Sequence, residues 1–315
     1  MKNKVFIAEK FAVHARAILQ AHPNIELTEN LSEAEALIIR SRTKIDANFL
    51  DQAALLKVIV TSTSGFDHID LDETQKRKIT VMYTPDANAI SAAEHTWSLL
   101  LSLLRFVPSA DRSMRGGAWT RELFNGFELA GKTLGIIGLG RIGTRVAMIA
   151  KGFSMTVVAF DPYQEDDVFK KLDLGRSSYE EVLKSSDILT FHVPMTKETR
   201  NMFNQSHAEY ISPKTVLVNT SRGGVVNELD LVTMLEQNKL AAAALDVFEK
   251  EPLARDSKLF KAPRLIMTPH LGALTTDAFE KSSMEAAHLI INFFLGNAVR
   301  NTLPLVNNWG TLSFD

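Results

Sequence analysis

Three ionisable residues in the second half of the chain could together carry out one reaction: Arg222, Glu251 and His270. A guanidinium group can hold a carboxylate or a keto oxygen in fork geometry. An imidazole can exchange a proton with a hydroxyl group near neutral pH. A carboxylate beside that imidazole favours its protonated form, so an acid is available when a ketone is reduced. These residue types suit hydride transfer to or from a 2-hydroxy acid.

Each of the three also has a purely structural explanation. Arg222 could be a charge in a surface turn, Glu251 a solvated loop residue, and His270 a strand-end histidine with satisfied hydrogen bonds. The joint pattern favours chemistry, because each residue follows a predicted strand and the carboxyl ends of parallel strands form a ligand-binding edge. The strands concerned are predicted at residues 216–219, 241–247 and 265–267.

A glycine motif of the form G-x-G-x-x-G stands between an apolar strand and a predicted helix from Thr144 to Lys151. The first glycine permits a tight turn, the second lets a pyrophosphate approach the backbone, and the third lets the helix pack on the strand. The helix N-terminus would direct its N–H groups at the pyrophosphate. The cofactor contacts predicted in this loop are Gly138, Gly140, Arg141, Ile142 and Gly143.

An acidic residue, Asp161, ends the next apolar strand, which is predicted at residues 156–160. At this distance from the glycine motif a carboxylate can accept hydrogen bonds from the ribose hydroxyls and repel a 2′-phosphate. The sequence therefore predicts NAD rather than NADP as the cofactor. The alternative is that Asp161 and Pro162 form an ordinary turn.

Apolar strands alternate with helical segments along most of the chain, which indicates parallel sheets covered on both faces. We predict an α/β protein with two doubly wound parallel-sheet domains, a Rossmann nucleotide domain inserted into a flavodoxin-like substrate domain. After His270 we expect no further strand, only a helix near residues 275–295 and a tail that return to the first domain. The predicted domains are 1–88 with 273–315 for the substrate and 89–272 for NAD.

A long helical pattern runs from Ser91 to about Met114, with Pro108 interrupting it. Ser91 and Glu94 match a capping box, which places the predicted helix start at Ser91. Trp119, after two glycines, is either a pocket residue or an interface aromatic.

The bulk composition narrows the function classes. The 315 residues suit two domains, and the apolar fraction of 45% is that of a globular protein. A net charge of −2 gives no electrostatic reason to expect nucleic acid or an anionic membrane as a partner. The absence of cysteine excludes disulfides and zinc–thiolate sites, and no other metal site is predicted. A cytoplasmic enzyme is the simplest expectation.

Combined in this order, the motifs resemble the D-isomer-specific 2-hydroxyacid dehydrogenase family from about residue 35 to residue 305. They are the glycine motif with Asp161, the blocks 219–228 and 244–252, and the block Thr268-Pro269-His270-Leu271-Gly272. The resemblance implies that Arg222, Glu251 and His270 are the catalytic set and that Asp246 lies close to the nicotinamide carboxamide. It also implies homodimers formed through the nucleotide domains.

The resemblance adds three cofactor contacts, His192, Pro194 and Thr220. His192 is a rival to His270 as the proton carrier. The family uses the strand end at His192 against the cofactor, so His270 is the preferred candidate.

The substrate contacts that we predict lie in the first domain. Ser64 and Gly65 follow a strand and could form an anion nest for the substrate carboxylate, although a plain turn is the alternative. Arg40, Ser41 and Asn88 resemble phosphate-binding positions of D-3-phosphoglycerate dehydrogenases, and an arginine pair suits a phosphate. The alternative is that the arginines of this segment are solvated.

Two departures leave the substrate open. Leu274 stands where phosphoglycerate enzymes commonly have smaller polar residues, and the chain ends soon after Val306, so serine feedback through a C-terminal regulatory domain is not expected. Glyoxylate or hydroxypyruvate reduction is therefore an alternative activity. A non-catalytic NAD(H)-sensing protein, like the corepressors that resemble this family, is the alternative of another class.

Overall fold

The chain forms two compact units in the computed structural model, which describes residues 2–298 and 300–303. Unit 1 extends to Ala89 and resumes at Ala273, and unit 2 comprises Ile90–Gly272. The chain thus leaves unit 1 once and returns to it once.

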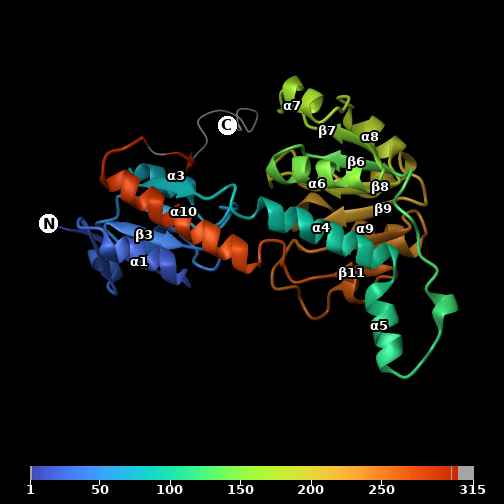
Figure 1. Ribbon diagram of the computed structural model, residues 1–315, viewed down its shortest axis with the longest axis horizontal. Coiled ribbons are helices and arrows are strands. Elements are labelled where there is room, and N and C mark those ends of the chain that lie inside the picture. Colours follow the sequence, from blue (N-terminus) through green and yellow to red (C-terminus); the bar gives the residue numbers. More distant parts are fainter. Residues whose placement is uncertain (1, 299, 304–315) are drawn as a thin grey trace. The chain divides into compact units, whose positions relative to one another are not determined.

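Unit 1, coloured blue to cyan and red in Figure 1, contains a sheet of six strands. The strand order is β12-β5-β4-β3-β1-β2. All neighbouring strands are parallel except β12, which is antiparallel to β5. The elements are β1 (Asn3–Ile7), α1 (Val13–Ala21), β2 (Ile25–Thr28), β3 (Ala36–Ile39), α2 (Ala47–Asp51), β4 (Val58–Thr61), α3 (Leu71–Lys76), β5 (Thr80–Tyr83), α10 (Thr276–Phe294) and β12 (Thr302–Leu303).

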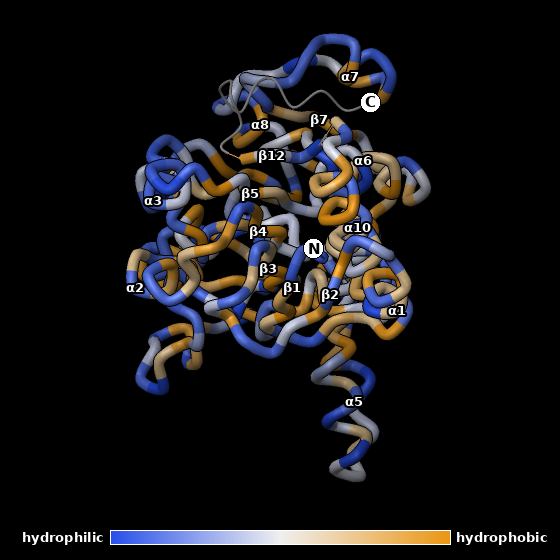
Figure 2. The backbone as a smooth tube through the Cα atoms, turned by 90° about the vertical axis from the view of Figure 1, so that its left-hand side faces the viewer, coloured by the Kyte–Doolittle hydropathy of each residue, from blue (hydrophilic) through white to orange (hydrophobic). Residues whose placement is uncertain are grey.

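Both faces of this sheet are buried. The strands β3 and β4 are buried at every residue, as continuous apolar runs in parallel sheets are. One apolar cluster packs α1 and α10 on one face, and a second cluster with residues of α2 covers the other. Figure 2 shows orange, hydrophobic stretches in the strands of this unit and both blue and orange residues along helix α1. The expectation of no strand after His270 is wrong, because β12 adds a two-residue strand.

Unit 2 contains a six-stranded parallel sheet in the order β11-β10-β9-β8-β6-β7. The order reverses between β6 and β8, where such sheets bind ligands. The elements are α4 (Ala89–Leu104), α5 (Val107–Arg115), β6 (Thr133–Ile137), α6 (Arg141–Gly152), β7 (Thr156–Phe160), α7 (Asp166–Lys171), α8 (Tyr179–Ser185), β8 (Ile188–Phe191), β9 (Val216–Asn219), α9 (Glu228–Glu236), β10 (Ala242–Leu245) and β11 (Leu265–Met267). The predicted fold class is confirmed.

The long helical segment differs from its prediction at its start and at the point where it breaks. α4 begins at Ala89, so Ser91 lies inside the first turn rather than at the N-cap. The amide of Ala89 already bonds to the carbonyl of Asp86, which starts the helical turn earlier. Phe106 is left-handed at φ 55°, and Pro108 stands in the first turn of the separate helix α5, a position that proline tolerates.

Among the described residues, no helix is long and apolar enough to cross a membrane.

Candidate active site

The strand ends of unit 2 divide into two halves. The glycine motif, Asp161 and His192 follow β6, β7 and β8, which are neighbours on one side of the sheet. The predicted catalytic residues follow β9, β10 and β11, which are neighbours on the other side. A ligand along this edge would therefore meet a nucleotide-binding half and an acid–base half.

His270 and Glu251 form a close pair. The Nδ1 atom of His270 lies 2.7 Å from Oε2 of Glu251, and the other carboxylate oxygen accepts from the amide of Phe248 at 3.0 Å. The hydrogen bond with Glu251 raises the pKa of His270, and burial opposes it. Burial alone would raise the pKa of Glu251, but its bonds with His270 and Phe248 lower it overall. The side chains are 46% and 37% exposed, so they remain open to a ligand.

Arg222 acts on the same pair. Its positive charge lowers the pKa of both His270 and Glu251. The turn that carries Arg222 is shaped by the buried Asn219, whose side-chain amide donates to the carbonyl of Arg222 at 2.9 Å. A Cβ on Gly223 would lie 1.8 Å from the carbonyl carbon of Phe248. The turn therefore packs directly on the loop before Glu251, and the three predicted catalytic residues come together.

The glycine loop has the geometry that a dinucleotide requires. Gly138 has φ 94°, a left-handed conformation that favours glycine. A Cβ on Gly143 would lie 2.0 Å from the carbonyl oxygen of Gly138, so only glycine lets α6 start so close to β6. A Cβ on Gly140 would meet no atom within 4 Å. Space for a phosphate thus remains at the N-terminus of α6, where Arg141 and Ile142 form the first turn.

Asp161 is attached to this loop. One carboxylate oxygen accepts from the amide of Leu139 at 2.8 Å, and the other accepts from the amides of Tyr163 and Gln164 at 2.9 and 3.1 Å. Gln164 in turn donates to the carbonyl of Leu139 at 2.9 Å. The carboxylate therefore stands at the loop as predicted, and it also holds the loop in place.

His192 differs from His270 in its surroundings. Burial lowers its pKa to about 3, and its Nε2 atom lies 2.9 Å from the hydroxyl of Thr190. Its Nδ1 atom is buried and has no hydrogen-bond partner among the described residues. A neutral imidazole of this kind is a poor proton carrier at neutral pH. The following Pro194 accepts through its carbonyl from Thr199 at 2.6 Å, which fixes this strand end.

Two other residues that we predict to contact the cofactor are hydrogen-bonded to side chains or amides of the protein itself. The hydroxyl of Thr220 lies 2.7 Å from that of Thr96 on α4. The carboxylate of Asp246 is fully buried and accepts from Thr268, from two backbone amides and from His95. Its hydrogen bonds outweigh burial, which alone would raise its pKa, and lower that pKa overall.

In unit 1, Arg40 and Ser41 follow β3. The Nη1 atom of Arg40 lies 3.2 Å from Oγ of Ser282 and 3.4 Å from Oγ of Ser62, and its guanidinium stacks over Phe279 at 5.1 Å from the ring centroid. Burial lowers the pKa of Arg40, against the effect of Glu9. Arg40 is thus an ordered, partly buried cation, whereas Ser41 is exposed.

Ser64 and Gly65 follow β4, next to β3 in the sheet. The hydroxyl of Thr63 donates to the carbonyl of Gly65 at 2.7 Å and fixes the turn. Asn88, after β5, has a buried Oδ1 atom without a hydrogen-bond partner among the described residues. The predicted substrate residues therefore follow three adjacent strands of unit 1.

Sequence reasoning missed several residues that hold these sites. His95, Asn219 and Gln164 each bond to a predicted site loop through a side chain. The position of Asn219 directly before the turn of Arg222 was a usable signal, because asparagine stabilises turns. His95 and Gln164 act across the sequence and gave no local signal.

The comparisons with known proteins agree with this geometry. Residues 97–272, more than half of the chain, match the family model described as D-isomer specific 2-hydroxyacid dehydrogenase, NAD binding domain. NAD, predicted as the cofactor, is confirmed as the cofactor of this domain.

Solved structures cover nearly the whole chain. A protein of Thermus thermophilus superposes with a TM-score of 0.86 at 31% identity, covering 95% of this chain and 99% of that one. D-lactate dehydrogenase from Aquifex aeolicus, complexed with NAD and lactic acid, superposes with a TM-score of 0.81 at 30% identity, covering 94% and 96%.

Two curated relatives are named D-3-phosphoglycerate dehydrogenase. The one from Archaeoglobus fulgidus is 40% identical over 89% of this chain and 53% of its own length, and the one from Bacillus subtilis is 38% identical over 96% and 59%. The chain thus spans little more than half the length of these relatives.

Proposed function

Because the chain belongs to the D-isomer-specific 2-hydroxyacid dehydrogenase family, we propose that it is an NAD-dependent oxidoreductase acting on C2 of a small 2-hydroxy or 2-keto acid. The observation that carries this proposal is the 2.7 Å contact between His270 and Glu251 beside Arg222. A cytoplasmic location is part of the proposal, because a chain without cysteine fits a reducing compartment.

NAD supplies the hydride acceptor in oxidation, and NADH the hydride donor in reduction. Residues of the glycine loop would hold the pyrophosphate, and Asp161 would bind the ribose hydroxyls. His192, Pro194 and Thr220 complete the proposed set, and the fully buried Asp246 would serve the cofactor only through the turn that it holds.

The acid–base steps belong to the residues of the chain. In reduction, Arg222 polarises the keto oxygen, and protonated His270 gives its proton to that oxygen as C2 receives the hydride, so a 2-hydroxy acid and a neutral imidazole result. Glu251 stabilises the imidazolium before the transfer. In oxidation, neutral His270 takes the hydroxyl proton.

For the substrate we propose an acid with a phosphate group, of which 3-phosphoglycerate is the candidate. Ser64 and Gly65 would hold the carboxylate, and Arg40, Ser41 and Asn88 the phosphate. Support comes from the ordered cation of Arg40, from the unpartnered Oδ1 atom of Asn88, whose amide could turn a donor to a phosphate, and from the names of the two curated relatives.

The test is NADH oxidation with 3-phosphohydroxypyruvate, hydroxypyruvate, glyoxylate and pyruvate. We expect the phosphorylated acid to have the highest kcat/KM. Arg40→Gln should lower it by about 10- to 100-fold for that acid alone, since a hydrogen bond to a charged group contributes about 1.5–3 kcal/mol. Lys44→Gln, the same charge change on an exposed side chain nearby, is the control.

Two results would change the proposal. A preference for glyoxylate or hydroxypyruvate that Arg40→Gln leaves intact would favour the reductase alternative. No NADH consumption with any acid, despite tight NADH binding, would favour the NAD(H)-sensing alternative.

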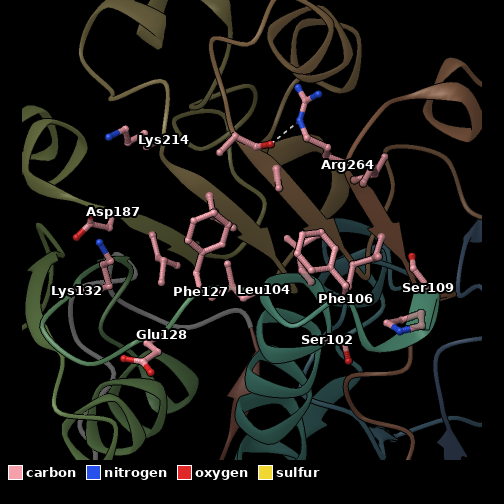
Figure 3. A pocket seen from close by; sticks show the side chains of 18 of the residues that line it. Ser102, Leu104, Phe106, Ser109, Phe127, Glu128, Lys132, Asp187, Lys214 and Arg264 are labelled. Carbon is pink, nitrogen blue, oxygen red and sulfur yellow. Dashed lines mark hydrogen bonds between the residues drawn. The ribbon is translucent and has the colours of Figure 1, made fainter. Parts of the chain in front are cut away.

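We also propose that the chain forms a homodimer through unit 2. A cavity of about 670 Å³ lies at the amino ends of the strands, opposite the catalytic residues. Figure 3 shows Leu104, Phe106 and Phe127 at this cavity, with Arg264 bonded to the carbonyl of Ala241. The segment after α4 also exposes large apolar side chains, namely Val107, Met114, Trp119, Leu123 and Phe127. A second copy of this chain would cover both the cavity and this segment.

Light scattering coupled to size exclusion tests the dimer. The chain has a mass of 35.0 kDa, so light scattering should give a dimer twice that mass. Leu123→Asp should shift the protein to the monomer mass, because a charge in an apolar interface is left without a partner. A monomeric native protein would contradict the dimer.

A further inference from the structure

The turn that carries His270 is attached to one buried residue, Asp246. Its Oδ1 atom accepts from the hydroxyl of Thr268 at 2.6 Å and from the amide of Leu271 at 2.8 Å, and its Oδ2 atom accepts from the amide of Gly272 at 2.8 Å. Its backbone carbonyl accepts from the amide of His270 at 2.8 Å. Every residue of the turn except Pro269 is therefore bonded to Asp246.

The turn needs this attachment, because His270 has a left-handed backbone with φ 54°. Such a conformation costs a residue other than glycine free energy, and it persists only where the surroundings over-determine it. The direction of the imidazole towards Glu251 depends on that backbone. The bonds to Asp246 thus decide where the Nδ1 atom of His270 points.

His95, a residue of α4, makes a further hydrogen bond to Asp246. Its Nε2 atom lies 3.1 Å from Oδ1 of Asp246 and 3.1 Å from the hydroxyl oxygen of Thr268. The hydroxyl of Thr268 donates to Oδ1, so the network assigns the Nε2–H of His95 as a donor shared by the two oxygens. The His95 side chain is only 18% exposed, so water cannot readily replace it.

The next residue of α4 reaches the other catalytic turn. The hydroxyl of Thr96 lies 2.7 Å from the hydroxyl of Thr220, two residues before Arg222. Two consecutive residues of one helix therefore touch the turns that present His270 and Arg222. This arrangement makes α4 the common support of the acid–base half of the sheet edge.

We propose that His95 is a positioning residue for proton transfer: it fixes Asp246, and through Asp246 the turn that aims His270 at Glu251. The inference rests on the proposed function, because it assigns His95 a part in the reaction of His270. It does not make His95 a catalytic residue.

The test compares three variants of the whole protein. His95→Leu removes the donor at similar volume. His95→Gln restores an N–H at about the reach of Nε2. Ser98→Ala is the control, because the Ser98 hydroxyl is on the same helix and, within the described part of the chain, bonds only to the carbonyl of Glu94.

Two measurements separate positioning from general stability. The first is kcat, KM and the dissociation constant of NADH. The second is the pKa of the His270 imidazole, measured by NMR in the cofactor-free protein and assigned with His270→Asn. The charged groups that act on this imidazole are Glu251, Arg222 and Asp246.

We expect His95→Leu to lower kcat by about 10- to 100-fold, since a misplacement of about 1 Å can cost that much. The dissociation constant of NADH should change by less than about twofold, well below the change expected in kcat. The pKa of His270 should fall towards its ordinary value as the contact with Glu251 loosens. His95→Gln should recover most of kcat and of the pKa, and Ser98→Ala should equal the native protein. If the leucine variant does not fold, His95→Asn, whose amide is one bond shorter, replaces it.

An unchanged kcat and an unchanged pKa of His270 in the leucine variant would overturn the inference. A fall in kcat together with a fall in NADH affinity and an unchanged pKa would also overturn it, because His95 would then serve cofactor binding. Failure of the proposed function is distinguishable: the native protein would reduce no acid, while the pKa of His270 would still report whether His95 holds the turn.

Discussion

The two units share one strand order and differ at the point where that order reverses. Unit 1 has β2-β1-β3-β4-β5 and unit 2 has β7-β6-β8-β9-β10, followed in each case by one more strand. In unit 2 the loop after β6 is glycine-rich and leaves space at Gly140. In unit 1 the corresponding loop after β1 carries Glu9, whose Oε1 atom accepts from the amides of Arg40, Arg42 and Thr43 at 2.9, 3.2 and 3.0 Å.

This difference shows that the strand order creates a crevice in each unit and that the side chains at the crevice determine what it can bind. In unit 1 three backbone N–H groups at the reversal point are already bonded to the carboxylate of Glu9, so an anion there would depend on side chains such as Arg40. In unit 2 the glycine loop carries no acidic residue of its own, and the carboxylate that bonds its Leu139 amide belongs to Asp161 at the neighbouring strand end, so the loop suits a dinucleotide. The ionisable side chains at the strand ends also differ between the two units. Unit 1 presents the cation of Arg40 without an imidazole partner, and unit 2 presents a complete acid–base pair.

The sharpest way to break this comparison is to remove the imidazole from unit 2. His270→Asn should lower kcat by about 10²- to 10⁴-fold, the usual contribution of a general acid or base. NADH should still bind, because the glycine loop is untouched. Steady-state rates and fluorescence titration of NADH measure the two quantities. Near-normal turnover would remove the chemistry from unit 2.

The nucleotide half is tested by a pair of glycines on α6. Gly143→Ala should raise the dissociation constant of NADH by about 100-fold, because its Cβ would lie 2.0 Å from the carbonyl oxygen of Gly138 and displace the loop. Gly152→Ala, on the same helix with no atom within 4 Å of the added methyl group, should bind NADH normally. Equal affinities in the two variants would show that the close approach at Gly143 is not needed for binding.

A smaller effect is expected on the pH dependence. Glu251 raises the pKa of His270, and reduction needs the protonated imidazole, so the rate of reduction should be lost as the pH rises through that raised pKa. Glu251→Gln removes the charge, so the alkaline limb of the profile should move to lower pH. Rate profiles of kcat/KM for the keto acid measure this shift. An unmoved limb would mean that another group titrates.

The parts of the site that were predictable from the sequence are those with short-range patterns. The glycine motif, Asp161 and the strand ends before Arg222 and His270 follow from local spacing, and all stand where the spacing placed them. The helix start at Ser91 was wrong, because the turn at Asp86 competes with the capping box. The strand β12 has two residues, too few for a periodic pattern.

The local sequence patterns did not predict the residues that hold the site in place. His95 and Asp246 are 151 residues apart in the chain, and their contact exists only because the fold brings α4 to the end of β10. Glu9 and Arg40 meet in the same way across 31 residues. Buried polar networks of this kind depend on tertiary geometry, which carries no periodic trace in the sequence.

The smallest expected effect concerns Glu9. Glu9→Leu leaves the half-buried amides of Arg40 and Thr43 without their acceptor, which should destabilise the protein by about 1–3 kcal/mol. Glu9→Gln keeps an acceptor oxygen and should cost less. For a protein of this size the leucine variant should lower the unfolding midpoint by about 2–10 °C, measurable by scanning calorimetry. NADH affinity should not change, because the carboxylate belongs to the crevice of unit 1. A leucine variant as stable as the native protein would mean that the loop 40–43 keeps its shape without Glu9. Glu9 would then not be what distinguishes the crevice of unit 1 from that of unit 2.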